Sequence, residues 1–193
     1  MRNLNLARPL AFVDLETTGL DIFRDRIIEI AILKAFPDGK EEIRTRRLNP
    51  GMAIPEKSTQ FHGIKDVDVA GKPTFEMVAQ SLFKYLDGCD FSGYNLIRFD
   101  LPFLSAEFAR CGLNFAWADR KVIDTMVIYH QKDPRNLAAA TRKYCGHDLE
   151  GAHGAEADVK AAARVLEGQL SIHKDIPKTV QGLNAMCRFL EGK

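Results

Sequence analysis

The stretch that most constrains the fold is A-F-V-D-L-E-T-T-G-L, residues 11–20, in which an apolar run carries two acids. The apolar residues predict a buried strand from Leu10 to Asp14. Side chains two residues apart on a strand share a face, with Cα atoms about 6.6 Å apart, so Asp14 and Glu16 should converge. Buried carboxylates are costly unless they protonate or meet a cation with oxygen ligands. We therefore interpret the pair as half of a metal site.

Thr17, Thr18 and Gly19 follow the two acids and predict a tight turn. Glycine permits a close backbone approach, and the amides of a turn can bind phosphate, so the turn is a candidate phosphate contact. An ordinary turn after an acidic strand end explains the same residues, because D-x-E alone is a short and frequent motif.

A hairpin is predicted next in the chain. Residues Arg26–Phe36 are rich in Ile and predict a mostly buried strand, which the turn Pro37–Lys40 joins to an antiparallel strand over Glu41–Leu48. Residues 49–73 contain scattered glycines and prolines and predict a long irregular connection, a kind of loop that is often functional. Phe61-His62-Gly63 lies within this connection.

Strands and helices alternate in the rest of the chain. Apolar residues at helical spacing predict a helix after Thr74, its N-cap. Phe91–Tyr94 predicts a short strand, followed by a helix from Asp100 to about Cys111. The last predicted elements are a strand at Lys121–Asp124, a helix capped by Asp124, and helices in Asn136–Gly146, Glu156–Leu170 and Val180–Leu190. This order predicts an α/β fold with a mixed sheet flanked by helices.

The composition predicts one soluble domain that spans residues 1–193, because 46% of the residues are hydrophobic and 27% are charged. We expect no membrane association and a cytoplasmic location, since no apolar stretch approaches the roughly 20 residues of a membrane span and the N-terminus lacks a signal-peptide core. The four cysteines form no C-x-x-C pair. Cys145, His147 and His153 fit no common zinc spacing, so neither a disulfide framework nor a zinc site is expected.

The net charge of +1 argues against nucleic-acid binding by bulk charge, so any such contact must be local. Arg44, Arg46 and Arg47 lie on a predicted strand, and Arg44 and Arg46 share one of its faces. Two interpretations remain open for these arginines: contact with phosphates, and protection of an exposed sheet edge from pairing.

Two further acids stand where a strand or loop meets a helix. Asp100 lies at the head of its predicted helix, where the helix N-terminus stabilises an ionised carboxylate; a plain N-cap is the alternative. Asp158 follows His153 by five residues, which would place their side chains about 140° apart on one helix. The two can meet only if His153 precedes the helix on a loop, which Gly154 permits.

Three fragments, taken together, resemble the three motifs of the DEDDh 3'-5' exonucleases: F-V-D-L-E-T-T-G, Y-N-L-I-R-F-D and H-G-A-E-A-D. The resemblance spans about residues 9–170 and implies a ribonuclease-H-like fold with a mixed five-stranded sheet. It implies a two-metal hydrolysis of phosphodiester bonds at the 3' end of a single strand, DNA before RNA. The implied roles are metal binding for Asp14, Glu16, Asp100 and Asp158, general base for His153, and two Mg²⁺ or Mn²⁺ ions as cofactors.

Details of the motifs favour one branch of this family. E-T-T-G-L and F-H-G-I resemble the proofreading exonucleases of replicative DNA polymerases more than oligoribonuclease. The chain ends soon after its last predicted helix, so no polymerase partner is expected from a tethering tail. The resemblance also implies wedging and stacking of the terminal nucleotides by Leu20 and Phe103. The full set of implied substrate contacts is Thr17, Thr18, Gly19, Leu20, His62, Asn95 and Phe103.

Other functions remain open from the sequence. A 3'-5' exoribonuclease would use the same residues on RNA. A module that binds nucleic-acid ends without turnover would tolerate loss of an acid or of the histidine, and all five residues are present. An internally cutting ribonuclease-H-type enzyme shares the metal-binding acids but does not account for His153.

Overall fold

The centre of the molecule is a mixed sheet of five strands in the order β3-β2-β1-β4-β5. The computed structural model describes residues 1, 3–132, 136–151 and 153–188. Neighbouring strands pair antiparallel from β3 to β1 and parallel from β1 to β5, so the predicted α/β class and mixed sheet are confirmed. The strands are β1 (Leu10–Thr17), β2 (Ile27–Ala35), β3 (Glu41–Arg47), β4 (Asp90–Gly93) and β5 (Val122–Asp124).

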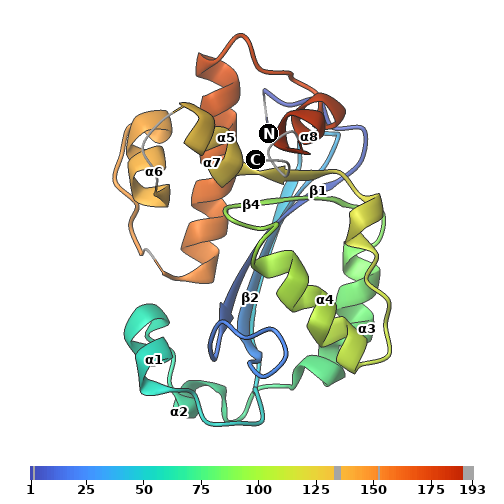
Figure 1. Cartoon of the computed structure of the whole chain (residues 1–193), viewed down its shortest axis with the longest axis vertical. Coiled ribbons are helices and arrows are strands. Elements are labelled where there is room, and N and C mark those ends of the chain that lie inside the picture. Colours follow the sequence, from blue (N-terminus) through green and yellow to red (C-terminus); the bar gives the residue numbers. More distant parts are fainter. Residues whose placement is uncertain (2, 133–135, 152, 189–193) are drawn as a thin grey trace.

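Two layers of helices cover the sheet (Figure 1). Helix α7 (Ala155–Ile172) packs on the face that carries Phe12 and Leu33. Helices α3 (Phe75–Leu86) and α4 (Asp100–Arg110) pack on the opposite face. The remaining elements after α4 are the 3-10 helix η1 (Trp117–Asp119), α5 (Thr125–Lys132), α6 (Leu137–Cys145) and α8 (Val180–Arg188).

The two edges of the sheet differ. Helix α8 covers the β5 edge, where the Val122 N–H donates to the Asn184 Oδ1 at 2.8 Å. Strand β3 is the other edge, and its side chains are mostly exposed, whereas every residue of β2 is buried. This contrast explains why Arg26–Phe36 is mostly apolar and Glu41–Leu48 is mostly charged.

Helix caps account for most boundaries that the sequence predicted. The Thr74 hydroxyl accepts the Met77 N–H, and the Asn136 Oδ1 accepts the Ala139 N–H at 2.7 Å. Gly146 ends α6 with φ = 78°, a left-handed conformation that glycine adopts without strain. Asp124 caps α5 through the Met126 N–H at 3.0 Å, as predicted. The predicted helix Val180–Leu190 is confirmed to Arg188, and residues 189–190 lie outside the described part.

The connection at residues 49–73 is not wholly irregular, and that prediction is wrong in part. It contains α1 (Glu56–His62) and the short α2 (Asp66–Val69). Helix α1 has no buried residue, so it shows no apolar periodicity from which a helix could be predicted. Pro55 and Gly63, read as loop residues, are its N-cap and its left-handed C-cap.

Strand β1 extends three residues beyond its predicted end, so Asp14 and Glu16 lie inside the strand. Pairing with β2 continues to Thr17, and an irregularity between Glu16 and Thr17 marks the end of the ladder. The four cysteines are free thiols. Among the described residues, no helix has the length and apolar character needed to span a lipid bilayer.

Candidate active site

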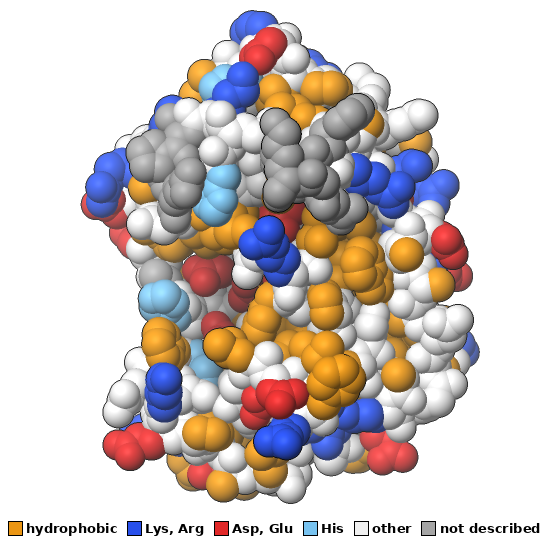
Figure 2. All heavy atoms as spheres, viewed as in Figure 1, with side chains coloured by type: hydrophobic (Ala, Val, Ile, Leu, Met, Phe, Trp, Pro, Cys, Tyr) orange, Lys and Arg blue, Asp and Glu red, His pale blue; other side chains and the backbone are white. Residues whose placement is uncertain are grey.

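Strand β1 presents Asp14 and Glu16 on the face covered by α7. Both are half-buried, and Glu16 lies directly opposite Glu29 of β2 in the antiparallel register. The prediction that the two acids share a face is confirmed. Acidic side chains gather in a hollow on this side of the molecule, with histidine side chains at its edge (Figure 2).

Asp100 begins α4 and is 3% exposed. Its Oδ1 accepts the Leu15 N–H of β1 at 3.0 Å, beyond the last residue pair of β1 with β4 at Phe12 and Ser92. The cap position belongs to Phe99, whose side chain makes no cap bond. Asp100 is therefore not a plain N-cap, because its carboxylate bonds the strand that carries the other two acids.

Asp158 lies in the first turn of α7, and His153 precedes this helix in an exposed turn. His153 has φ = 70°, a left-handed conformation that is unusual for a residue other than glycine. This placement confirms that His153 lies on a loop before the helix. Burial raises the pKa of Asp158, and the charge and backbone N–H of His153 partly offset that effect. The Asp158 Oδ1 is buried and has no hydrogen-bond partner.

The four acids influence one another electrostatically. Burial raises the pKa of Asp14 well above its usual value, and Asp100, Asp158, Glu16 and Glu29 raise it further. Burial, and then Asp158, Glu29 and Asp100, raise the pKa of Glu16 to about 8. Burial also raises the pKa of Asp100, against hydrogen bonds from its own backbone and from Leu15. The fold thus concentrates negative charge from β1, α4 and α7 in one place.

The donor set has the chemistry that a divalent cation requires. All four acids offer carboxylate oxygens, the ligands that Mg²⁺ and Mn²⁺ prefer, and the unpartnered Asp158 Oδ1 leaves an acceptor for an ion. A cation would also relieve the repulsion that raises the pKa values of Asp14 and Glu16. Within the described residues, however, no three Asp, Glu, His or Cys side chains are grouped so that they could hold an ion as they stand.

Two acids near the site were missed in the sequence. Glu29 is 9% exposed and bonds Arg47 of β3, Nε to Oε2, at 3.0 Å. Its signal was an acid in the middle of the buried strand I-I-E-I. Asp124 is 1% exposed and accepts the N–H groups of Asn95 at 2.9 Å and Ile97 at 3.2 Å, so it shapes the turn that leads to α4. No sequence signal separated this second role of Asp124 from its role as a cap.

The Thr17–Gly19 turn is closed by a neighbouring acid. The buried Thr18 hydroxyl donates to the Asp25 Oδ1 at 2.9 Å, and it accepts the Arg26 N–H at 3.0 Å. A Cβ on Gly19 would clash with the Asp25 carboxylate, so a larger residue there would have to displace the side chain that closes the turn. The Thr17 hydroxyl donates to the Gly19 carbonyl at 2.5 Å. A phosphate contact by this turn stays a prediction.

The other predicted substrate contacts fall in different surroundings. Leu20 is 83% exposed beside the turn. The half-buried His62 accepts the Ile64 N–H through Nδ1, and its buried Nε2 has no partner. Asn95, with φ = 61°, lies in the turn that Asp124 holds. Their contact with substrate stays a prediction.

The stacking role predicted for Phe103 is wrong. Phe103 is fully buried in the core beneath α4, with its ring centroid 5.1 Å from that of Phe99. Phe103 lies three residues after Asp100 in α4, on the side of the helix that packs against the sheet. The ring is therefore not accessible to a nucleotide.

Known proteins share this architecture. E. coli Exonuclease I in complex with a dT13 oligonucleotide superposes with a TM-score of 0.73 at 20% identity, over 86% of this chain and 41% of that chain. The zinc-ion-bound form of the E. coli Exonuclease I complex with single-stranded DNA gives a TM-score of 0.69 at 19% identity, over 86% and 40%. These likenesses show a common fold, the ribonuclease-H-like fold that the resemblance implied.

Sequence comparison identifies the family. The RNase T family model, described as exonuclease, matches residues 11–166, so the chain belongs to this family and carries the motifs of its DEDDh-type 3'-5' exonucleases. The 3'-5' exonuclease DinG of Staphylococcus saprophyticus is 29% identical over 167 residues, 83% of this chain and 18% of that protein. DinG of Bacillus subtilis is 36% identical over 115 residues, 59% of this chain and 12% of that protein. The chain thus spans less than a fifth of the length of these relatives.

Proposed function

We propose that residues 1–193 form a single exonuclease domain that removes nucleotides from the 3' end of single-stranded nucleic acid with the help of divalent cations. The observation that carries the proposal is the convergence of four carboxylates, from β1, α4 and α7, in which Asp100 and Asp158 raise the pKa values of Asp14 and Glu16. A structural ion-pair network would contain compensating cations, whereas acids that only repel one another need an external cation.

The four acids would hold two Mg²⁺ or Mn²⁺ ions, with Asp14 shared between them. Such ions would supply positive charge that stabilises the negative charge developing on the attacked phosphate. The Asp100 carboxylate accepts a hydrogen bond from the Leu15 N–H, and this bond fixes the position of the carboxylate relative to β1.

His153 is the general base of the proposed reaction. Its exposed turn lets a ring nitrogen reach the attacking water, whose proton it accepts as the phosphodiester bond breaks. The contact with Asp158 orients the turn that carries the histidine. No cysteine or serine is needed as a nucleophile, because water attacks directly.

Single-stranded DNA is the proposed substrate class. The solved relatives include Exonuclease I bound to dT13 and to dA16, which are single strands of different sequence. Leu20 and the neighbouring Phe23, which are 83% and 82% exposed, offer apolar contacts that every base can make. RNA as substrate and a role beside a polymerase in repair or replication are alternatives that share this site.

Gel analysis of a strand labelled at its 5' end tests the proposal. We expect a ladder that shortens from the 3' end, for DNA faster than for RNA. Internal cuts would instead indicate a ribonuclease-H-type endonuclease, and a shifted band without shortening would indicate an end-binding module.

A further inference from the structure

A basic cavity of about 450 Å³ lies where the β2–β3 hairpin meets the segment before α3. Three of its lining residues are cationic: Arg46, Arg47 and Lys72. The other lining residues are Glu29, Thr45 and Pro73. For a chain whose net charge is only +1, this is a local concentration of positive charge.

The cavity is built from parts that hold one another in place. Arg47 bonds the buried Glu29 through Nε at 3.0 Å, and its Nη1 lies 3.7 Å from the Asp68 Oδ1. The segment with Lys72 is tied to the end of β3, because the Asn49 N–H donates to the Pro73 carbonyl at 2.9 Å.

Two of the cations are free to bind an anion. Arg46 and Lys72 are exposed, and no carboxylate of the described chain lies within salt-bridge distance of either one. A carboxylate-paired Arg47 still presents guanidinium N–H donors that Glu29 does not use. The cavity therefore combines one fixed guanidinium with the exposed Lys72, and Arg46 adds charge at its rim, because Arg46 alternates with Arg47 along β3 and its side chain starts from the other face.

The register of the sheet connects this cavity to the candidate active site. Glu16, Glu29 and Arg47 are direct partners across β1, β2 and β3, and so share the face on which Asp14 lies. Neighbouring strands are about 4.8 Å apart, so the Arg47 backbone lies about 10 Å from that of Glu16. A group bound in the cavity would lie beside the acids without touching them.

We propose that the basic cavity binds a backbone phosphate of the nucleic-acid strand whose 3' end lies at the acids, an inference that rests on the proposed function. Arginine recognises phosphate through paired N–H donors, and lysine adds a point charge. The strand then runs from Asp14 and Glu16 across β2 to the β3 edge. Protection of the edge from pairing would explain Arg46 and Arg47, but it requires neither Lys72, from another segment, nor the buried Glu29.

The salt dependence of strand binding tests the cavity. We would measure the affinity for a fluorescent dT oligonucleotide by anisotropy in an Asp14→Asn background, so that the strand stays intact. Each phosphate contact to a single strand contributes about 0.7 to the slope of log affinity against log salt. Arg46→Ala with Lys72→Ala should lower this slope by about 0.7, because the cavity binds one phosphate.

A matched double variant controls for the loss of charge. Arg44→Ala with Lys84→Ala removes the same charge outside the cavity, since the Arg44 guanidinium lies over the Tyr85 ring and Lys84 is exposed on α3. The slope should stay at that of the Asp14→Asn parent in this control. Equal slopes in the two double variants would overturn the proposal.

A mononucleotide ester separates this inference from the proposed function. With Asp14 intact, the cavity double variant should release nitrophenol from p-nitrophenyl thymidine 5'-monophosphate at the wild-type rate, while its KM for the oligonucleotide rises several-fold. Loss of ester hydrolysis in the variant would mean that the cavity serves the acids and not the strand. A wild-type protein that cleaved neither substrate would refute the proposed function, and the salt slopes would still decide the cavity.

Discussion

His153 combines a proposed catalytic role with a backbone conformation, φ = 70°, that costs any residue except glycine on the order of 1 kcal/mol. His153→Ala keeps this cost and should lower kcat by ~10²–10⁴, the usual contribution of a general base. His153→Gly should lower kcat equally but unfold at a higher temperature than the alanine variant. Kinetics over a range of pH and thermal unfolding would check both expectations. If the alanine variant kept the wild-type rate and pH dependence, His153 would be an ordinary loop residue without a catalytic role.

Glu16 makes the stability of the metal-free protein depend on pH. Its pKa is raised from 4.5 to about 8, so between these values the folded state binds more protons than the unfolded chain. Stability should therefore fall as the pH rises through this window and level off above it. Thermal unfolding in chelator should show this fall, and Glu16→Gln should reduce it. A Tm that is flat or rises across the window in wild type would contradict the assignment.

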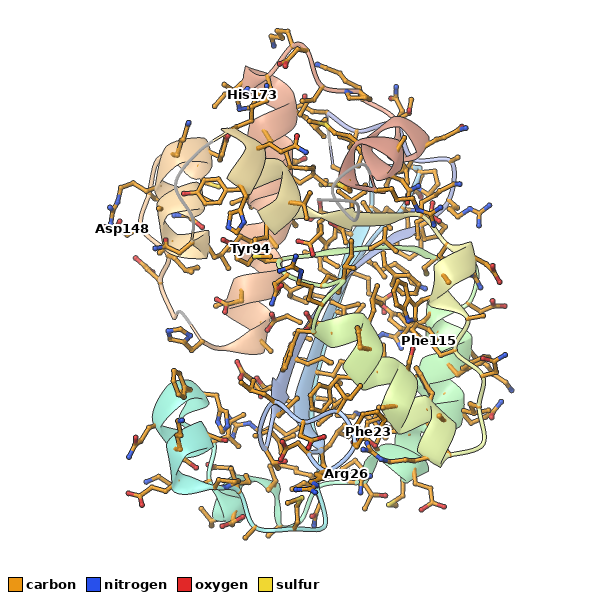
Figure 3. All side chains as sticks on the ribbon, viewed as in Figure 1. Phe23, Arg26, Tyr94, Phe115, Asp148 and His173 are labelled. Carbon is orange, nitrogen blue, oxygen red and sulfur yellow. The ribbon has the colours of Figure 1, made fainter. Side chains whose placement is uncertain are left out.

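At the scale of elements, the loop between β1 and β2 holds two apolar side chains in solvent, and Figure 3 shows Phe23 on it with Arg26 at its end. Two aspartates stabilise the loop. The Asp21 Oδ1 accepts the Phe23 N–H, and the Asp25 Oδ2 accepts the Asp21 N–H, both at 2.9 Å. Because positioning contacts act on binding, Leu20→Ala should raise KM for a single strand more than it lowers kcat.

A control for this loop is Met77→Ala on α3, which removes an apolar side chain that is 76% exposed elsewhere. Its KM should match that of wild type. An unaltered KM in the Leu20 variant, or an equal rise in the Met77 variant, would remove Leu20 from substrate positioning.

Helix α4 is tied to the start of β2 by a buried carboxylate. The fully buried Glu107 accepts from the Arg26 Nε at 2.8 Å, the Arg26 Nη2 at 3.1 Å and the Ile27 N–H at 3.2 Å. Glu107→Ala leaves these donors without their acceptor and should cost roughly 3 kcal/mol of stability. Urea unfolding would measure this loss of stability. Glu150→Ala, which removes an exposed acid, is the control. A loss of stability in Glu107→Ala no larger than that in Glu150→Ala would mean that water replaces the carboxylate.

The sequence predicted those elements whose signals are local. Apolar runs and a hairpin turn located all five strands, helical spacing and end signals located the helices from α3 to α8, and Thr74, Asn136 and Gly146 marked helix ends. Helix α1 escaped because it buries no side chain.

The sequence motifs predicted which acids and which histidine form the candidate site, but not how the residues around them pack. Asp14, Glu16, Asp100 and Asp158 do come together, but the burial of Phe103 and the role of Glu29 depend on which face packs against what. That information is carried by tertiary contacts and not by spacing along the chain. The metal-binding roles of the acids stay predictions.

At the scale of the whole molecule, the five proposed catalytic residues come from segments far apart in the chain, and all lie within residues 11–166. Strand β1 supplies two acids, and helices α4 and α7 bring the others to it from opposite faces of the sheet. The hydrophobic cores on both faces thus hold together acids that repel one another. A cation would add to that stability by binding the folded state alone.

The central claim is that these acids form one cation-dependent nuclease site, and the most direct test is shortening of a 5'-labelled single strand in chelator with Mg²⁺ or Mn²⁺ added back. Wild type should be inactive in chelator and should shorten the strand from its 3' end when either ion is restored. Asp14→Asn, which removes one charge at nearly constant size, should stay inactive throughout while remaining folded. Full activity of wild type in excess chelator, or unchanged activity of the Asn variant, would contradict the account.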